Sequence, residues 1–249
     1  MLTKVKTKKV VDYRAKPILK YALPLLITLF TNPTIYAQTL VSDDFNGSSV
    51  NSSIWNTVLP FGQSQISESG GYLTTTGRGI LETVAGFSSP YMVSGAVTLN
   101  NSFEHFEITL RSNLQTGYQS TDGSFYYELT GVKAEFSADG NQISIQEFTP
   151  TDTTILSQAS YSLSIGQTYD FSVTDTGSEI DFAINGVSLL SAMTTYSTGN
   201  QIAFQSREFN DTSSSLDFVS IQAVPEPSSF ALVGLGVLSL IGIRRQTKK

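Results

Sequence analysis

Pairs of closely spaced carboxylates are the groups in this 249-residue chain that could hydrolyse a glycosidic bond. Such hydrolysis needs two carboxyl groups flanking one bond, and residues two apart in a strand point to the same side of a sheet. Glu104 and Glu107 are three apart, so a regular strand would point them to opposite faces. Glu179 and Asp181 share a face, but they stand beside a turn without a third carboxylate. We expect both pairs to be solvated surface groups, and we expect no enzymatic activity.

Nucleophilic and zinc chemistry lack the residues that they need. His105 is the only histidine, and the chain contains no Gly-x-Ser-x-Gly elbow on which a serine nucleophile could be built. Without cysteine and with one histidine, a zinc site of the usual ligand set is excluded. The absence of cysteine also means that packing alone must hold the fold together.

Tyrosines in polar, glycine-rich surroundings are the residues that could stack on sugar rings. The candidates are Tyr118, Tyr126 and Tyr127, together with Tyr91 and Tyr196. Tyr126 and Tyr127 must point to opposite faces of a strand, so only one of them is exposed on a given side. The alternative is that these rings are core residues or cross-strand pairs, which is the usual role of aromatics in sheets.

Three aspartates could hold a calcium ion between the first and the last strand. Asp43 and Asp44 lie in the opening segment and Asp217 in the closing one, and hard cations take carboxylate oxygens. The alternative is an acidic cluster on the surface. We expect no other cofactor.

The charge of the chain is unevenly distributed. Seven of the fifteen Lys and Arg residues lie in the first 20 residues and four in the last six, whereas only Asp12 and Glu226 among the acidic residues fall outside residues 38–223. That central segment therefore carries nineteen acidic and four basic side chains, a formal charge of −15. Such a surface repels nucleic acid and anionic lipid, so neither is an expected partner.

Short strand-like runs separated by turn signals fill the central segment. Phe106, Ile108 and Leu110 alternate with polar residues, and Asn185–Gly186 between two apolar runs predicts a hairpin. No convincing helix lies between the two hydrophobic ends. We predict an all-β fold, an antiparallel β-sandwich. The expected strands are residues 40–45, 71–74, 79–84, 91–99, 103–111, 125–129, 142–148, 169–173, 180–184, 187–190, 202–204 and 216–221.

The last 26 residues combine a rigid motif, an apolar helix and a basic end. Val224, Pro225, Glu226 and Pro227 form the motif, because the prolines keep it extended. Residues 230–243 would rise roughly 21 Å as a helix, short of the ~30 Å hydrocarbon core. Arg244 and Arg245 follow as a cytoplasmic stop.

This order resembles the PEP-CTERM sorting signal of exopolysaccharide-producing Gram-negative bacteria. The resemblance assigns residues 224–249 to sorting and implies cleavage by an exosortase after transient anchoring in the inner membrane. The tail is also called an ice-binding protein C-terminal domain, but the chain shows no regular Thr-x-Thr array that would support ice binding.

The first 37 residues resemble a secretory signal peptide. A basic leader precedes an apolar stretch, residues 21–30, and Ile35, Tyr36 and Ala37 precede Gln38. We expect cleavage after Ala37, although Ile35 is larger than the usual alanine at its position. The partners implied are the Sec translocon and signal peptidase, and an uncleaved signal anchor is the alternative. Residues 38–223 are then the exported domain.

The exported segment resembles concanavalin A-like lectin/glucanase domains. The resemblance is carried by residues 43–48 (DDFNGS) with Trp55, by residues 175–186 and by residues 216–221. It implies a jelly roll in which the first strand pairs near the last and Trp55 packs beneath the sandwich. The implied role is an envelope or matrix protein associated with exopolysaccharide. The alternatives are a structural protein without a ligand pocket and a divergent family 16-like glycoside hydrolase.

Overall fold

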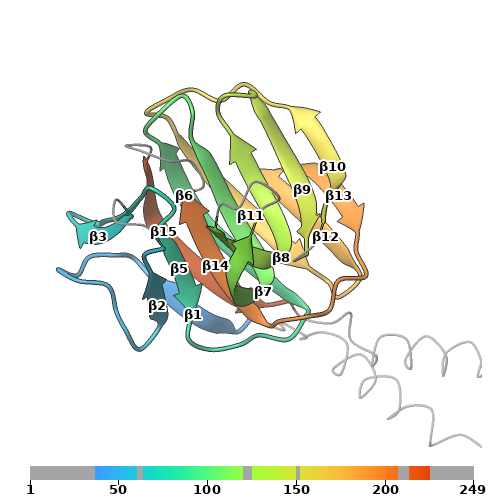
Figure 1. Cartoon of the computed structure of the whole chain (residues 1–249), viewed down its shortest axis with the longest axis horizontal. Helices are drawn as coiled ribbons and strands as arrows, with labels where there is room; N and C mark the ends of the chain where they lie inside the picture. Colours follow the sequence, from blue (N-terminus) through green and yellow to red (C-terminus); the bar gives the residue numbers. More distant parts are fainter. Residues whose placement is uncertain (1–36, 61–63, 120–124, 150–151, 207–212, 225–249) are drawn as a thin grey trace, which may run out of the picture. The chain divides into compact units, whose positions relative to one another are not determined.

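Two antiparallel sheets stacked face to face form the part of the chain that the structure describes (Figure 1). The structure is a computed structural model, and it describes residues 37–60, 64–119, 125–149, 152–206 and 213–224. The side chains of residues 114–119 and 125–128 are not included in this description. The all-β antiparallel sandwich predicted from the sequence is confirmed.

The first sheet has eight strands. In spatial order they are β13 (Val187–Met193), β12 (Glu179–Ile184), β11 (Thr168–Asp175), β6 (Tyr91–Leu99), β15 (Ser213–Ala223), β4 (Tyr72–Thr76) and β3 (Gln65–Ser69), with β1 (Thr39–Asp43) paired to β15. The first strand therefore pairs with the last, as expected. Asn185 and Gly186, with φ of 51° and 76°, make the predicted tight turn between β12 and β13.

The second sheet has seven strands. Their order is β10 (Thr153–Ser160), β9 (Gln142–Phe148), β8 (Phe125–Ser137), β7 (His105–Gln119), β14 (Gln201–Ser206), β5 (Ile80–Thr83) and β2 (Trp55–Val58). Three strands that the sequence pattern did not predict are β2, β3 and β10. Strand β10 pairs along its whole length with β9 at the edge of the sheet, although its side chains are mostly exposed or half-exposed.

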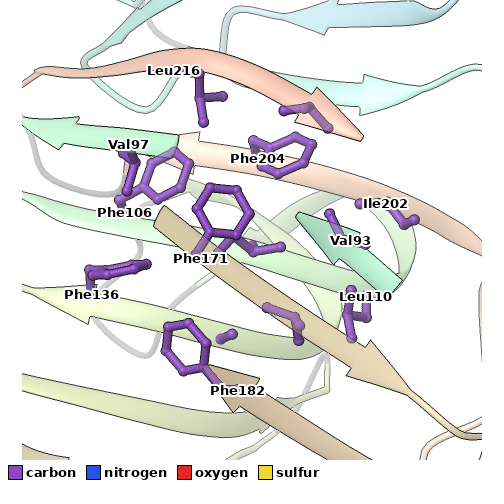
Figure 2. Packing of buried hydrophobic residues seen from close by; sticks show 14 of the residues in the cluster. Val93, Val97, Phe106, Leu110, Phe136, Phe171, Phe182, Ile202, Phe204 and Leu216 are labelled. Carbon is purple, nitrogen blue, oxygen red and sulfur yellow. The ribbon is translucent and has the colours of Figure 1, made fainter. Parts of the chain in front are cut away.

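The core lies between the sheets and is dominated by phenylalanine rings (Figure 2). Phe106, Phe136 and Phe204 come from the seven-stranded sheet, and Phe171 and Phe182 come from the eight-stranded one. The Phe106 and Phe171 ring centroids are 6.3 Å apart, and those of Phe136 and Phe182 are 5.3 Å apart in an edge-to-face arrangement. Contacts of this kind add to the burial of apolar area and fix how the two sheets face each other.

Trp55 joins the opening strand to the core. Its ring packs against Phe45 and Phe204, with centroids 6.3 Å and 5.9 Å away. Its indole Nε1 donates a hydrogen bond of 2.7 Å to Asp43 Oδ2 at the end of β1. The position beneath the sandwich that the resemblance implied for Trp55 is confirmed.

The β7–β8 hairpin bends back over its own sheet. The register of β7 and β8 shifts between Leu110 and Asn113, where Arg111 has a φ of 52° and Gly131 on the partner strand has a φ of 154°. Beyond this bend, Leu129 clusters with Ile80 and Ala203, which lie on β5 and β14. Since β7 and β14 separate β8 from β5 in the sheet, Leu129 reaches them only across the outer face. The hairpin therefore covers part of that face.

The predicted signal helix and anchor helix lie outside the described residues. Among the residues that the structure does describe, none form a helix of the length and apolarity needed to cross a membrane.

Candidate functional site

A buried polar network occupies the outer face of the seven-stranded sheet. Glu107 on β7 and Glu135 on β8 are direct register partners, and their side chains are only 1% and 3% exposed. Lys133 Nζ donates to Glu107 Oε2 at 2.7 Å and lies 4.3 Å from the centroid of the Phe148 ring. The lysine thus compensates one carboxylate inside the protein.

The second carboxylate of the network, Glu135, also has partners within the sheet. Its oxygens accept hydrogen bonds from Ser144 Oγ at 3.0 Å and from Gln146 Nε2, and Oε1 lies 2.7 Å from His105 Nδ1. The other ring nitrogen of His105 lies 3.0 Å from Asp139 Oδ1. His105 therefore bridges two carboxylates.

The contact with His105 helps to lower the pKa of Asp139. Partial burial alone would raise the pKa of the Asp139 carboxyl, but the hydroxyl of Ser137 and the charge and hydrogen bond of His105 together lower it below its usual value. Asp139 therefore stays ionised where an ordinary aspartate would begin to protonate.

The prediction that Glu104 and Glu107 are solvated surface groups is wrong. Glu104 is fully buried and accepts hydrogen bonds from Ser206 and Ser214, which belong to the two different sheets. Glu107 is buried within the polar network of the sheet, beside Lys133 and Glu135, which the period of the strand alone does not reveal. For the second predicted surface pair, Glu179 is exposed and Asp181 is half-exposed, and they accept hydrogen bonds from Ser191 and Ser188.

Glu107 and Glu135 are two carboxylates that the strand register makes neighbours, but they lack the accessibility that glycoside hydrolysis needs. Hydrolysis requires two carboxyl groups that flank a bound glycosidic bond. Both carboxylates are buried, however, and both are bonded to internal partners. In this conformation the pair stabilises the sheet rather than facing a substrate.

A second buried network joins the two sheets at one end of the sandwich. Arg111 on β7 binds Asp175 on β11 in a bidentate pair, with Nε to Oδ2 at 2.8 Å and Nη2 to Oδ1 at 2.6 Å. The guanidinium also donates to the carbonyl oxygens of Tyr196 and Gly177. Burial alone would raise the pKa of Asp175, but hydrogen bonds from Arg111, the Gly177 amide and Ser89 lower it below its ordinary value.

Burial also raises the pKa of two further groups. Burial, followed by the charge of Asp175, raises the pKa of the Tyr91 hydroxyl. Burial raises the pKa of Glu82, and the hydrogen bond from Ser112 Oγ, 2.8 Å from Oε1, offsets only part of that shift.

The three aspartates predicted to hold calcium do not converge. Asp43 accepts from the backbone amide of Phe45 at 3.0 Å and from Trp55, while Asp44 accepts from the amide of Asn46. Asp217 is exposed on β15. Within the described ranges, no three His, Cys, Asp or Glu side chains are grouped so that they could share a metal ion.

The tyrosine candidates separate into two groups. Tyr91 and Tyr196 are buried, so the expectation that they could stack on sugar is wrong, and the alternative of core packing holds for them. Tyr118 and Tyr126 are direct register partners in the β7–β8 hairpin, and Tyr127 is the next residue of β8. Their side chains lie outside the described part of the structure, so their role in binding stays a prediction.

The described residues next to the two predicted processing sites lie close together. Ala37 and Gln38 are exposed, and the amide of Ala223 donates to the carbonyl oxygen of Gln38 at 2.9 Å. Val224 donates its amide to Pro90 O at 3.1 Å. Pro225, Glu226, Pro227, Arg244 and Arg245 lie outside the described residues.

Known proteins of similar structure share this fold. The chain is similar to the CBM66 carbohydrate-binding module from Bacillus subtilis, with 12% identity and a TM-score of 0.53 over 69% of this chain and 96% of the module. It is similar to a Bacillus licheniformis β-glucanase, with 12% identity and a TM-score of 0.54 over 74% of this chain and 98% of the glucanase.

An endo-β-1,3-glucanase from Pyrococcus furiosus gives 12% identity and a TM-score of 0.51 over 75% of this chain and 94% of the glucanase. No curated protein matches the chain in sequence. Residues 223–246 match the PEP-CTERM protein-sorting motif, which implies an exported protein. The chain thus joins a PEP-CTERM sorting motif to a β-sandwich with the jelly-roll fold of concanavalin A-like and glucanase domains.

Proposed function

We propose that this protein is exported to the cell envelope or extracellular polymer, where it binds exopolysaccharide without hydrolysing it. The observation that carries the proposal is the sorting motif at residues 223–246 directly after a jelly-roll sandwich. The motif supports export, and a fold shared with a carbohydrate-binding module supports sugar binding.

The proposed route begins at the inner membrane. The Sec translocon carries the chain across, and signal peptidase cuts between Ala37 and Gln38. The apolar residues 230–243 then hold the precursor in the membrane until an exosortase cuts near residues 224–227. The hydrogen bond between Ala223 and Gln38 keeps the described residues next to the two proposed cut sites close together.

The burial of the carboxylate pair supports binding over hydrolysis. A glycosidase must bring an acid and a nucleophile to one glycosidic bond, whereas Glu107 and Glu135 are buried and bonded to Lys133 and Gln146. Their register on neighbouring strands and the glucanases among the similar structures favour a hydrolase as the second candidate.

One experiment separates these functions. The full chain, purified in mild detergent, is incubated with the extracellular polysaccharide of the producing cells, and both retention and new reducing ends are measured. A binder is retained and releases no reducing ends. Release of reducing ends that is lost in both Glu107→Gln and Glu135→Gln would replace the binder with a hydrolase. Neither retention nor cleavage would leave a purely structural matrix protein.

A further inference from the structure

The outer face of the eight-stranded sheet carries a row of hydroxyl groups that crosses five strands. One hydroxyl residue from each of β3, β4, β15, β6 and β11 is in direct register with the next, and neighbouring strands lie about 4.8 Å apart. Thr98 and Thr168 are hydrogen-bonded to each other at 2.7 Å. In order, the row is Ser67, Thr74, Ser215, Thr98 and Thr168.

A second hydroxyl row runs parallel to the first. It consists of Ser42, Ser220, Ser94 and Ser172, which come from β1, β15, β6 and β11 in direct register. All four side chains are exposed or half-exposed, and they alternate along their strands with buried core residues. Small hydroxyl side chains at this spacing make a flat surface that can both donate and accept hydrogen bonds.

An aromatic pair lies on the same face. The register of β15 shifts between Leu216 and Phe218, a bulge that turns Phe218 outward, so that it is 38% exposed. Phe218 is in register with Ala96, between the two hydroxyl rows. Tyr72, 48% exposed, precedes Leu73, the register partner of Leu216, and so lies beside the bulge. A ring and flanking hydroxyls are the groups that a sugar ring needs for stacking and for hydrogen bonds.

The charge of this face limits the polysaccharides that it could accept. Asp170, Glu179 and Asp217 are exposed on its strands. Among the described residues of the sandwich, the cations Arg78, Arg111 and Lys133 are all buried. An approaching polyanion therefore meets like charge with no exposed cation among those residues to compensate it.

We propose that the outer face of the eight-stranded sheet, centred on Phe218 and Tyr72, binds a polysaccharide that carries no anionic groups. The inference rests on the proposed function and assigns its site and ligand class. It places binding on the eight-stranded sheet, whereas the corresponding face of the seven-stranded sheet is partly covered by the β7–β8 hairpin. An uncharged sugar chain stacks on the two rings, and the hydroxyl rows and Asp170 bond to its hydroxyl groups.

The test separates the extracellular polysaccharide of the producing cells on an anion exchanger into an uncharged and an acidic fraction. The full chain, in mild detergent, is titrated with each fraction. We expect binding to the uncharged fraction, weakened roughly three- to tenfold by Phe218→Ala and by Tyr72→Ala. Thr98→Val removes one hydroxyl without changing the shape of the side chain, so a weakening of about twofold is expected. Ile155→Ala is the matched control, because Ile155 is a 56% exposed apolar residue on the other sheet.

Each outcome separates this inference from the proposed function. Binding confined to the acidic fraction, or binding to the uncharged fraction that Phe218→Ala, Tyr72→Ala and Thr98→Val all leave unchanged, would overturn the inference while leaving a polysaccharide binder. A weakening of about twofold in Thr98→Val, whose fold is checked by thermal unfolding, supports the site even if an alanine variant fails to fold. No binding of the wild-type chain to either fraction would remove the proposed function itself.

Discussion

Removal of the Arg111 guanidinium tests whether the buried Arg111–Asp175 pair between the two sheets stabilises the sandwich. Asp175 is fully buried, and Arg111 supplies two of its hydrogen bonds. Arg111→Met would leave that carboxylate ionised and uncompensated, which costs about 3–5 kcal/mol in buried pairs. Total stabilities are about 5–15 kcal/mol, so this is a large share of the free energy of unfolding.

Urea unfolding followed by tryptophan fluorescence measures the loss. Trp55 is the only tryptophan of the chain and is buried, so its emission reports on the sandwich whatever the two ends of the chain do. A loss of about 4 kcal/mol moves the midpoint down by roughly 2 M urea. The control is Asp170→Asn on β11, the strand that also carries Asp175. It changes an exposed carboxylate and should shift the free energy of unfolding by less than about 0.5 kcal/mol.

The double variant Arg111→Met with Asp175→Leu distinguishes a charge effect from a packing effect. It removes both charges, so it should be more stable than Arg111→Met alone. Acid should destabilise the wild-type protein, as Arg111→Met does. The pKa of Asp175 is lowered in the folded state, so its contribution is complete above about pH 4 and is lost as the pH falls through that lowered value. An Arg111→Met cost below about 1 kcal/mol at pH 7 would refute the reasoning.

Three further outcomes are expected. Replacing residues 224–227 with alanine should leave an uncut precursor in the inner membrane; intact mass of the secreted wild-type protein that still includes Lys249 would contradict this. Glu82→Gln should raise the urea midpoint at pH 7 and flatten its fall with rising pH, because burial raises the pKa of Glu82 and ionisation therefore disfavours the folded state; an unchanged pH profile would argue against it. Trp55→Phe should cost about 1–3 kcal/mol, measured by near-ultraviolet circular dichroism, because Asp43 loses its indole donor; a neutral result would show that water replaces the donor.

Local sequence patterns predicted the strands whose residues alternate strongly. Phe106, Ile108 and Leu110 are all buried in the core, as their period of two predicted, and Asn185–Gly186 turns the β12–β13 hairpin. The pattern failed for β3 and β10, because these polar strands bury few side chains and are held by backbone pairing to one neighbour each. Backbone pairing leaves no mark in the hydrophobic period of a strand.

The polar residues show where local patterns stop. Glu107 and Glu135 are 28 positions apart in the sequence, and only the register of β7 with β8 makes them neighbours. The serine and threonine rows of the eight-stranded sheet likewise combine residues from as many as five strands, so no single segment contains the pattern. The sequence pattern predicted a strand over residues 216–221, which includes Phe218. The exposure of the Phe218 ring follows only from the bulge in β15.

The sequence by itself determined the sorting motif, the charge of the central segment and the all-β class, because each of these depends on composition or on residues close together in the chain. Only the tertiary structure decided which face of each sheet is open. The bend at Arg111 and Gly131 brings Leu129 onto Ile80 and Ala203 on the outer face of one sheet, while the bulge beside Phe218 turns that ring to the outer face of the other. A strand period says which side chains share a face, but packing between distant segments decides whether water or protein meets that face.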